Sequence, residues 1–371
     1  MQEPNIAAIQ STVAWATFAL SFALGAVMNR TGFCTMGAIS DIVNMRDWTR
    51  MRMWLCAIGV AVLGTQLLAW AGVVDLTKSF YTAPGFTWLS YTTGGLLFGF
   101  GMVLASGCGS KTLVRMGGGS LKAVVVFVVL GLFAYMTLRG VFGVFRFNVL
   151  DPVAVQFAPG QDLPRLFGGK DASTVQQMRL AIGIGVGAVL VLFAFADREF
   201  RRFDNILGGL GIGLAIVGTW AVSGYLGYVA EDPNTLEEKF VGTNSGRLES
   251  LSFVAPVAYT LELLMFWSDK SKFVTLGIAA VLGMVAGSFA YAIATRQFRW
   301  EGFRNAEDTA NHLVGAALMG VGGVTAMGCT VGQGLSGVST LATGSVLAFA
   351  AIVVGGWAGV RYQAWRVERL A

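Results

Sequence analysis

Ten apolar stretches, each close to the length that crosses a lipid bilayer, dominate this chain. A membrane-spanning helix needs about 20 mostly apolar residues, and a helix also pairs all of its own backbone groups. Only 13% of the 371 residues are charged, about half the share of a soluble domain. The sequence therefore predicts an all-α polytopic membrane protein. The stretches cover residues 6–28, 51–74, 88–108, 120–145, 178–196, 205–228, 251–267, 273–295, 311–329 and 343–362.

The loop charges indicate how the chain is threaded through the bilayer. The net charge of +5 lies in the loops, where it acts as a topology signal and does not indicate nucleic-acid binding. An N-terminus outside and a C-terminus inside would require an odd number of crossings, so one stretch would fail to cross and about nine would remain. The loop 229–250 is expected to lie outside and is acidic, with Glu231, Asp232, Glu237, Glu238 and Glu249.

The chain is expected to form a single membrane domain, 1–371, built from two pseudo-symmetric halves. The loop 146–177 contains three prolines and mixed charges, which is typical of a linker. It would join a first half, 1–145, to a second half, 178–371. The segment 28–45 is too polar to span and too apolar for a plain loop, so we expect a short re-entrant helix there.

A duplicated segment supports the division into halves. GGLLFGFGMVLASGC, which ends at Cys108, matches GAALMGVGGVTAMGC, which ends at Cys329, 221 positions later. A polar turn follows each copy, and then Gly119-Ser120 and Gly344-Ser345 each open another apolar stretch. Internal repeats are common in transporters, where broken helices at the repeat interface form the substrate site.

Three of the four cysteines lie where an apolar helix meets a glycine-rich break: Cys34, Cys108 and Cys329. The fourth, Cys56, lies inside an apolar stretch without a break, so it is expected to be an ordinary buried residue. The chain contains no C-x-x-C pair and one histidine, so we expect no metal site, disulfide relay or cofactor. Separated neutral thiols at helix breaks instead suit a path for a soft, sulfur-bearing anion, to which they can donate weak hydrogen bonds.

An anion also requires positive potential, which broken helices provide through the free N–H groups at their N-termini. The turns after Cys108 and Cys329 would each start a short helix, and only the first turn carries cations. The positive-inside rule is an alternative explanation for those cations. The candidate anion-binding residues are Gly109, Lys111, Arg115, Thr330 and Gln333.

Three other polar residues have simpler interpretations. Arg30 is expected to be an interfacial anchor, and His312 a satisfied interior or interfacial residue. Glu262 lies within an apolar stretch, where a buried acid is costly and indicates function or an ion pair.

Three segments resemble the signature segments of the YeeE/YedE family of bacterial inner-membrane proteins: GAVMNRTGFCTMGAISD, GFGMVLASGCGSKTLVRMGGGS and GVGGVTAMGCTVGQGLSGVSTLATGS. The resemblance implies a multi-pass protein of the inner membrane that takes up thiosulfate. It implies about nine spans, short helices entering from both faces, and Cys34, Cys108 and Cys329 along a narrow path. It also implies a TusA-like sulfur-carrier protein as a partner, besides the lipid bilayer.

Two alternatives to thiosulfate transport stay open on the sequence. The cargo could be another small sulfur or selenium species, because the sequence does not define the size of the pocket. The protein could instead be a membrane sulfurtransferase that forms a cysteine persulfide, which requires a thiolate beside a cation. Cys108 near Lys111 meets that requirement weakly, so no enzyme activity is expected.

Overall fold

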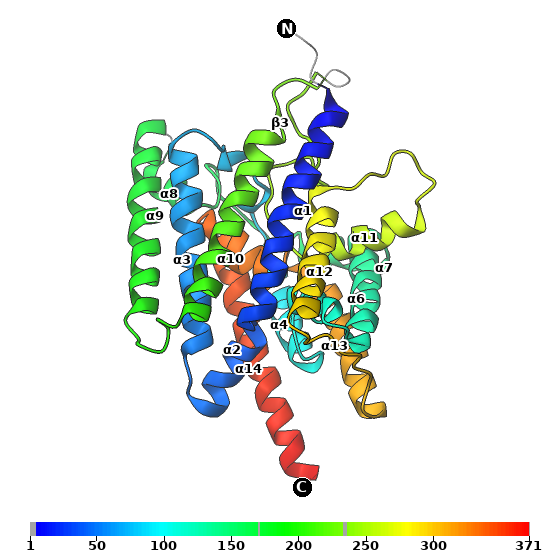
Figure 1. Ribbon diagram of the computed structural model, residues 1–371. Coiled ribbons are helices and arrows are strands. Elements are labelled where there is room, and N and C mark those ends of the chain that lie inside the picture. Colours follow the sequence, from blue (N-terminus) through cyan, green and yellow to red (C-terminus); the bar gives the residue numbers. More distant parts are fainter. Residues whose placement is uncertain (1–4, 170, 233–235, 371) are drawn as a thin grey trace.

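The computed structural model describes residues 5–169, 171–232 and 236–370, and its long helices lie alongside one another between two faces (Figure 1). The two ends of the chain lie at opposite faces, as an odd number of crossings requires (Figure 1). Within the described residues, eight helical segments are long and apolar enough to cross a membrane. The predicted all-α polytopic fold is therefore confirmed.

The helices and short strands follow one another in this order. The first part of the chain holds α1 (Ile6–Thr31), α2 (Thr35–Met45), α3 (Thr49–Trp70), η1 (Leu76–Lys78), η2 (Phe80–Thr82), β1 (Gly85–Phe86), α4 (Trp88–Leu104), α5 (Gly109–Gly117), α6 (Leu121–Arg139), α7 (Val141–Phe145), η3 (Arg146–Leu150), β2 (Val155–Gln156) and α8 (Leu163–Gly168). The second part holds α9 (Ala172–Phe195), α10 (Phe203–Ala221), η4 (Val222–Leu226), β3 (Tyr228–Val229), β4 (Lys239–Phe240), α11 (Ala255–Met265), α12 (Leu276–Ala294), α13 (Ala306–Thr325), η5 (Gly332–Gly337) and α14 (Thr343–Leu370). The strands form two antiparallel pairs, β1 with β2 and β3 with β4.

Two of the ten apolar stretches differ from the eight candidate spans. The stretch 251–267 forms α11, which has 11 residues and is too short to cross. The stretch 311–329 covers most of α13 and the break that follows it. Although α13 has 20 residues, its first turns hold Glu307, Asp308 and His312, which lower its mean hydropathy. The described residues therefore hold eight candidate spans, where the sequence predicted about nine crossings. The segment 28–45 ends in the short helix α2, as predicted.

Glycines of the two repeat copies pack directly against each other where α4 crosses α13. A Cβ atom on Gly322 would lie 2.6 Å from the Gly94 carbonyl oxygen, and one on Gly94 would lie 2.7 Å from the Gly322 oxygen. Gly101 and Gly315 repeat this relation at 2.7 and 2.6 Å. Since Gly94 corresponds to Gly315 and Gly101 to Gly322, each copy presents the same surface to the other, as in a two-fold interface. The crossing is antiparallel.

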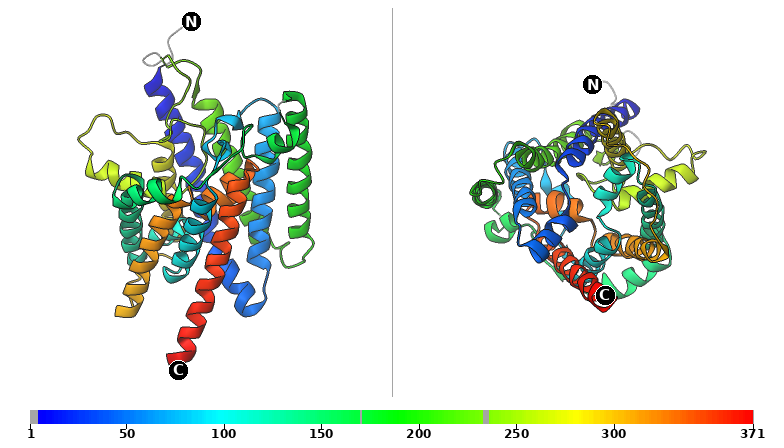
Figure 2. Two further views of the ribbon diagram at one scale, coloured as in Figure 1. Left: turned by 180° about the vertical axis from the view of Figure 1, so that it is seen from behind. Right: turned by 60° about the horizontal axis from the view of Figure 1, so that its bottom comes forward.

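The helices α14 and α6 pack on α4 and α13 at equivalent positions of the two copies. Gly99 of α4 meets the backbone of Gly355 in α14, and its counterpart Gly320 of α13 meets Leu130 in α6. Leu130 and Gly355 are themselves counterparts in the register set by Gly119 and Gly344. Small residues allow membrane helices to approach closely, so the repeated glycines position the two broken helices. The segment 330–339, orange in Figure 2 (right), lies inside the ring of long helices and is buried throughout apart from the partly buried Val338.

Candidate functional site

The helix breaks before Cys108 and Cys329 have the same backbone geometry. Ser106 and Met327 occupy equivalent positions and adopt left-handed conformations, with φ of 57° and 55°. The next residue closes each helix: Gly107 N donates to Met102 O, and Gly328 N donates to Gly323 O, both at 2.8 Å. This six-residue closure is a Schellman motif. The predicted helix breaks are therefore confirmed, and they end both helices inside the protein.

Each of the three thiols lies at the start of a short helix and is buried. The Cys34 Sγ accepts a hydrogen bond from Gly37 N at 3.5 Å, and the Cys329 Sγ accepts one from Gly332 N at 3.4 Å. The Cys108 Sγ lies 3.3 Å from the Ser110 hydroxyl oxygen. Free backbone N–H groups and the helix dipole make such positions favourable for negative charge.

Cys108 links the other two thiols. It is close enough to Cys34 and to Cys329 to interact electrostatically with each of them. Cys56 lies apart from this group, fully buried between α3 and Gly209 of α10. Among the residues that the structure describes, no three His, Cys, Asp or Glu side chains are arranged to hold a metal ion.

A cavity of about 240 Å³ reaches the segment around Cys329. Its wall includes Gly328 and Ser252, and the Ser252 hydroxyl lies 4.0 Å from the Cys329 Sγ. Glu249 and Tyr259 also line this cavity. The cavity therefore ends beside Cys329, whose thiol is buried behind its wall.

Positive charge is found beside Cys34. Lys111 and Arg50 both interact electrostatically with its thiol. Arg50 also lies 3.2 Å from the Asp41 carboxylate, whereas Lys111 has no ion pair within the described residues. Sequence reasoning identified Lys111 but not Arg50. A Cβ atom on Gly37 would lie 2.4 Å from Arg50 Nη1, so a larger residue there would require the guanidinium to shift.

Several buried polar atoms beside the thiols make no hydrogen bond within the described chain: Thr35 Oγ1, Tyr81 OH, Thr330 Oγ1 and Gln333 Oε1. An unpaired buried polar group costs about 1–3 kcal/mol, so such groups are expected to pair with water or with a bound ligand. The Gln333 amide nitrogen donates to Ala326 O at 2.6 Å, which leaves its oxygen near the break. Gly109 packs against the Phe253 carbonyl, where a Cβ atom would lie 3.0 Å away.

Sequence reasoning missed Thr35, Tyr81 and Ser252. Thr35 directly follows Cys34 and could have been found from that position. Tyr81 and Ser252 lie in segments remote from any of the cysteines along the chain, so no local signal marked them.

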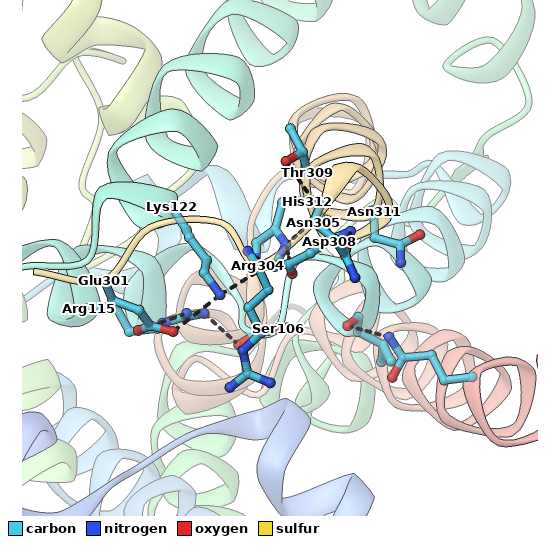
Figure 3. A network of polar contacts seen from close by, with 12 residues as sticks. Ser106, Arg115, Lys122, Glu301, Arg304, Asn305, Asp308, Thr309, Asn311 and His312 are labelled. Carbon is cyan, nitrogen blue, oxygen red and sulfur yellow. Dashed lines mark hydrogen bonds and ion pairs between the residues drawn. The ribbon is translucent and has the colours of Figure 1, made fainter. Parts of the chain in front are cut away.

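Arg115 belongs to a separate ion cluster (Figure 3). It donates to the Ser106 carbonyl at 3.3 Å and lies 3.7 Å from Glu301. Lys122, which is buried, joins Glu301 at 3.2 Å to Asp308 at 3.0 Å. His312 is buried beside Asp308, at 3.0 Å, as expected for an interior residue, but its Nε2 has no hydrogen-bond partner among the described residues, so the ring is only partly satisfied. The charge of Arg115 is therefore already paired, and the cluster ties the start of α6 to the start of α13.

The other two polar residues with simple interpretations also form ion pairs. Glu262 is buried and lies 2.6 Å from Lys272, with the Tyr135 hydroxyl at 3.4 Å. Arg30 lies 2.8 Å from Asp204 and stacks over the Phe203 ring. Both contacts are consistent with structural roles.

Comparison with known proteins gives a consistent result. A family model described as sulphur transport matches residues 30–358. A thiosulfate transporter, TsuA, from Escherichia coli is 26% identical over 357 residues, covering 90% of each chain. A thiosulfate transporter of the same name from Spirochaeta thermophila is 25% identical over 372 residues, covering 92% of this chain and 97% of the relative.

Proposed function

Because this chain belongs to the YeeE/YedE sulphur transport family, we propose that it carries thiosulfate across the bacterial inner membrane along its three helix-break thiols. The family match and the two relatives indicate transport of sulfur compounds, and the candidate spans indicate a multi-pass membrane protein. Thiosulfate itself, the inner membrane and the cysteine path are the parts that we propose.

The observation that carries the proposal is the central place of Cys108, within electrostatic reach of both Cys34 and Cys329. We propose that an anion passes from one thiol to the next by way of Cys108. Thiols suit this role because a neutral S–H donates a weak hydrogen bond, so the anion is bound without being trapped. The short helices add positive potential at each step.

The basic residues support a direction for the path. The α2–α3 and α9–α10 connections and the end of α14 lie at the face that holds the C-terminus (Figure 1). Three arginines are found at each of residues 46–52, 198–202 and 361–369. The positive-inside rule makes this face cytoplasmic. Thiosulfate would then enter through the cavity beside Cys329 and leave past Cys34. A TusA-like carrier on the cytoplasmic side, as the family resemblance implies, stays a prediction.

Uptake into proteoliposomes tests the proposed cargo. We expect saturable uptake of radiolabelled thiosulfate, which excess unlabelled thiosulfate abolishes and excess sulfite or selenite leaves largely unchanged. Equal inhibition by sulfite or selenite would support the alternative of a broader or different cargo. Absence of labelled uptake, with folded protein confirmed by size exclusion, would contradict thiosulfate transport.

Lys111→Gln tests the positive charge beside Cys34. Removing an unpaired cation near a passing anion costs about 1 kcal/mol in a partly hydrated site, so we expect an increase of about fivefold in the KM for thiosulfate uptake. Lys270→Gln is the matched control, because it removes the same charge from an exposed loop position. An unchanged KM for Lys111→Gln, or the same increase in both variants, would remove Lys111 from the site.

A further inference from the structure

Glu249 is an acidic residue on the wall of the cavity that leads to Cys329. It lies three positions before Ser252, whose hydroxyl lies 4.0 Å from the Cys329 Sγ. The buried Tyr81 hydroxyl interacts electrostatically with both Glu249 and Cys329. The carboxyl group therefore lies on the proposed route of a doubly negative anion.

The surroundings of Glu249 do not neutralise its charge. Asn244 N donates to Oε1 at 3.0 Å, and the Ser245 hydroxyl donates to Oε2 at 3.2 Å. Within the described residues no cation lies at ion-pair distance from Glu249. Arg146 lines the same cavity, but it lies 3.2 Å from Asp151.

The remaining titratable and charged groups near Glu249 do not supply a partner either. Tyr259 of α11 and Tyr81 of η2 are neutral phenols that interact electrostatically with it. Arg247, two positions earlier in the chain, is exposed to solvent. An ionised Glu249 would thus stand in the cavity as an uncompensated negative charge.

Two like charges a few ångströms apart repel each other strongly when water is largely excluded. A protonated carboxyl is neutral and becomes a hydrogen-bond donor. Ionised Glu249 would therefore exclude an anion from the cavity, whereas protonated Glu249 would help to bind it.

We propose that Glu249 is a proton-binding residue of the pathway, and that the anion occupies the cavity beside Cys329 only when the Glu249 carboxyl is protonated. The inference rests on the proposed function and adds a proton site to it. Burial raises the pKa of Glu249 to about 7, although the hydrogen bonds from Asn244 and Ser245 lower it. The proton would therefore be lost between neutral and mildly alkaline pH, and anion occupancy would fall as the pH rises.

The test compares Glu249→Gln with the unmodified protein at equal pH on both sides of a proteoliposome, from about pH 6 to about pH 8.5. For one group that titrates near 7, the protonated fraction falls about 30-fold over this range, so we expect the initial rate of thiosulfate uptake to fall by the same factor. Thiosulfate stays a dianion throughout. Glu249→Gln is neutral at every pH, so its uptake should be independent of pH and within about threefold of the unmodified protein at the lowest pH.

His312→Gln is the control, because histidine is the side chain that ordinarily titrates in this range and His312 is the one histidine of the chain. It belongs to the ion cluster around Asp308 (Figure 3) and does not line the cavity, so this variant should keep the full pH dependence. A pH dependence that persists in Glu249→Gln would overturn the proposal. A Glu249→Gln protein that elutes as folded yet takes up no anion at any pH would overturn it as well.

Calorimetric binding of thiosulfate to the detergent-purified protein separates this proposal from the proposed function. Affinity for the unmodified protein should fall with rising pH by the same factor, and Glu249→Gln should remove that fall. If binding shows this pattern while uptake is absent, the proton site stands and the transport function fails. If uptake is present and neither readout depends on Glu249, the proton site fails and the transport function stands.

Discussion

Cys108→Ala is expected to lower thiosulfate uptake by about 10- to 100-fold. A hydrogen bond to a charged group contributes about 1.5–3 kcal/mol, and each 1.4 kcal/mol corresponds to about tenfold in an equilibrium constant. The effect should be the largest of the three thiols, because Cys108 is the one within reach of both others. The measurement is growth of a sulfate-uptake-deficient bacterium on thiosulfate as sole sulfur source, with uptake rates at matched expression.

Cys56→Ala provides the matched control for this result. Cys56 is fully buried, packs against Gly209 and lies outside the thiol group. Its replacement should cost about 1 kcal/mol of stability or less through the lost sulfur atom, and uptake should stay within about twofold. If Cys108→Ala supports growth as well as the unmodified protein, Cys108 has no part in moving the anion.

Gly322→Ala is expected to destabilise the whole protein. The new Cβ atom would lie 2.6 Å from the Gly94 carbonyl oxygen, so α4 and α13 would have to separate. Overpacking of this kind costs typically about 1–3 kcal/mol and occasionally more. We expect a lower midpoint of thermal unfolding, measured by size exclusion after heating. Gly101→Ala should lower the midpoint by a comparable amount, because its Cβ atom would lie 2.7 Å from the Gly315 oxygen.

Gly185→Ala separates this steric effect from a general effect of alanine in a membrane helix. Gly185 lies within α9, and no atom lies within 4 Å of the position that its Cβ would occupy. Alanine favours helix over glycine by about 0.5–1 kcal/mol, so the midpoint should stay the same or rise. Gly322→Ala and Gly185→Ala proteins of equal thermal stability would show that the glycine crossing does not position the two broken helices.

The amino-acid sequence alone determined the membrane fold, the ten apolar stretches, the short helix after Cys34 and the breaks at Cys108 and Cys329. These features depend on local properties: apolar length, glycine content and the match between two segments of the same chain. The repeat in particular encodes its own packing, because the glycines that correspond in sequence also meet in space. Family membership followed from the same segments.

Only the tertiary structure decided how the charges are used. Arg115, a candidate anion-binding residue in the sequence, pairs with Glu301, whereas Arg50, which the sequence did not single out, lies near Cys34. The sequence places Glu249 in an acidic outer loop. Only the folded chain shows that it lines the cavity that ends beside Cys329. The electrostatic role of a residue depends on its burial and on its distance from other charges. Both are determined by contacts between segments far apart in the chain, so a local sequence pattern does not reveal them.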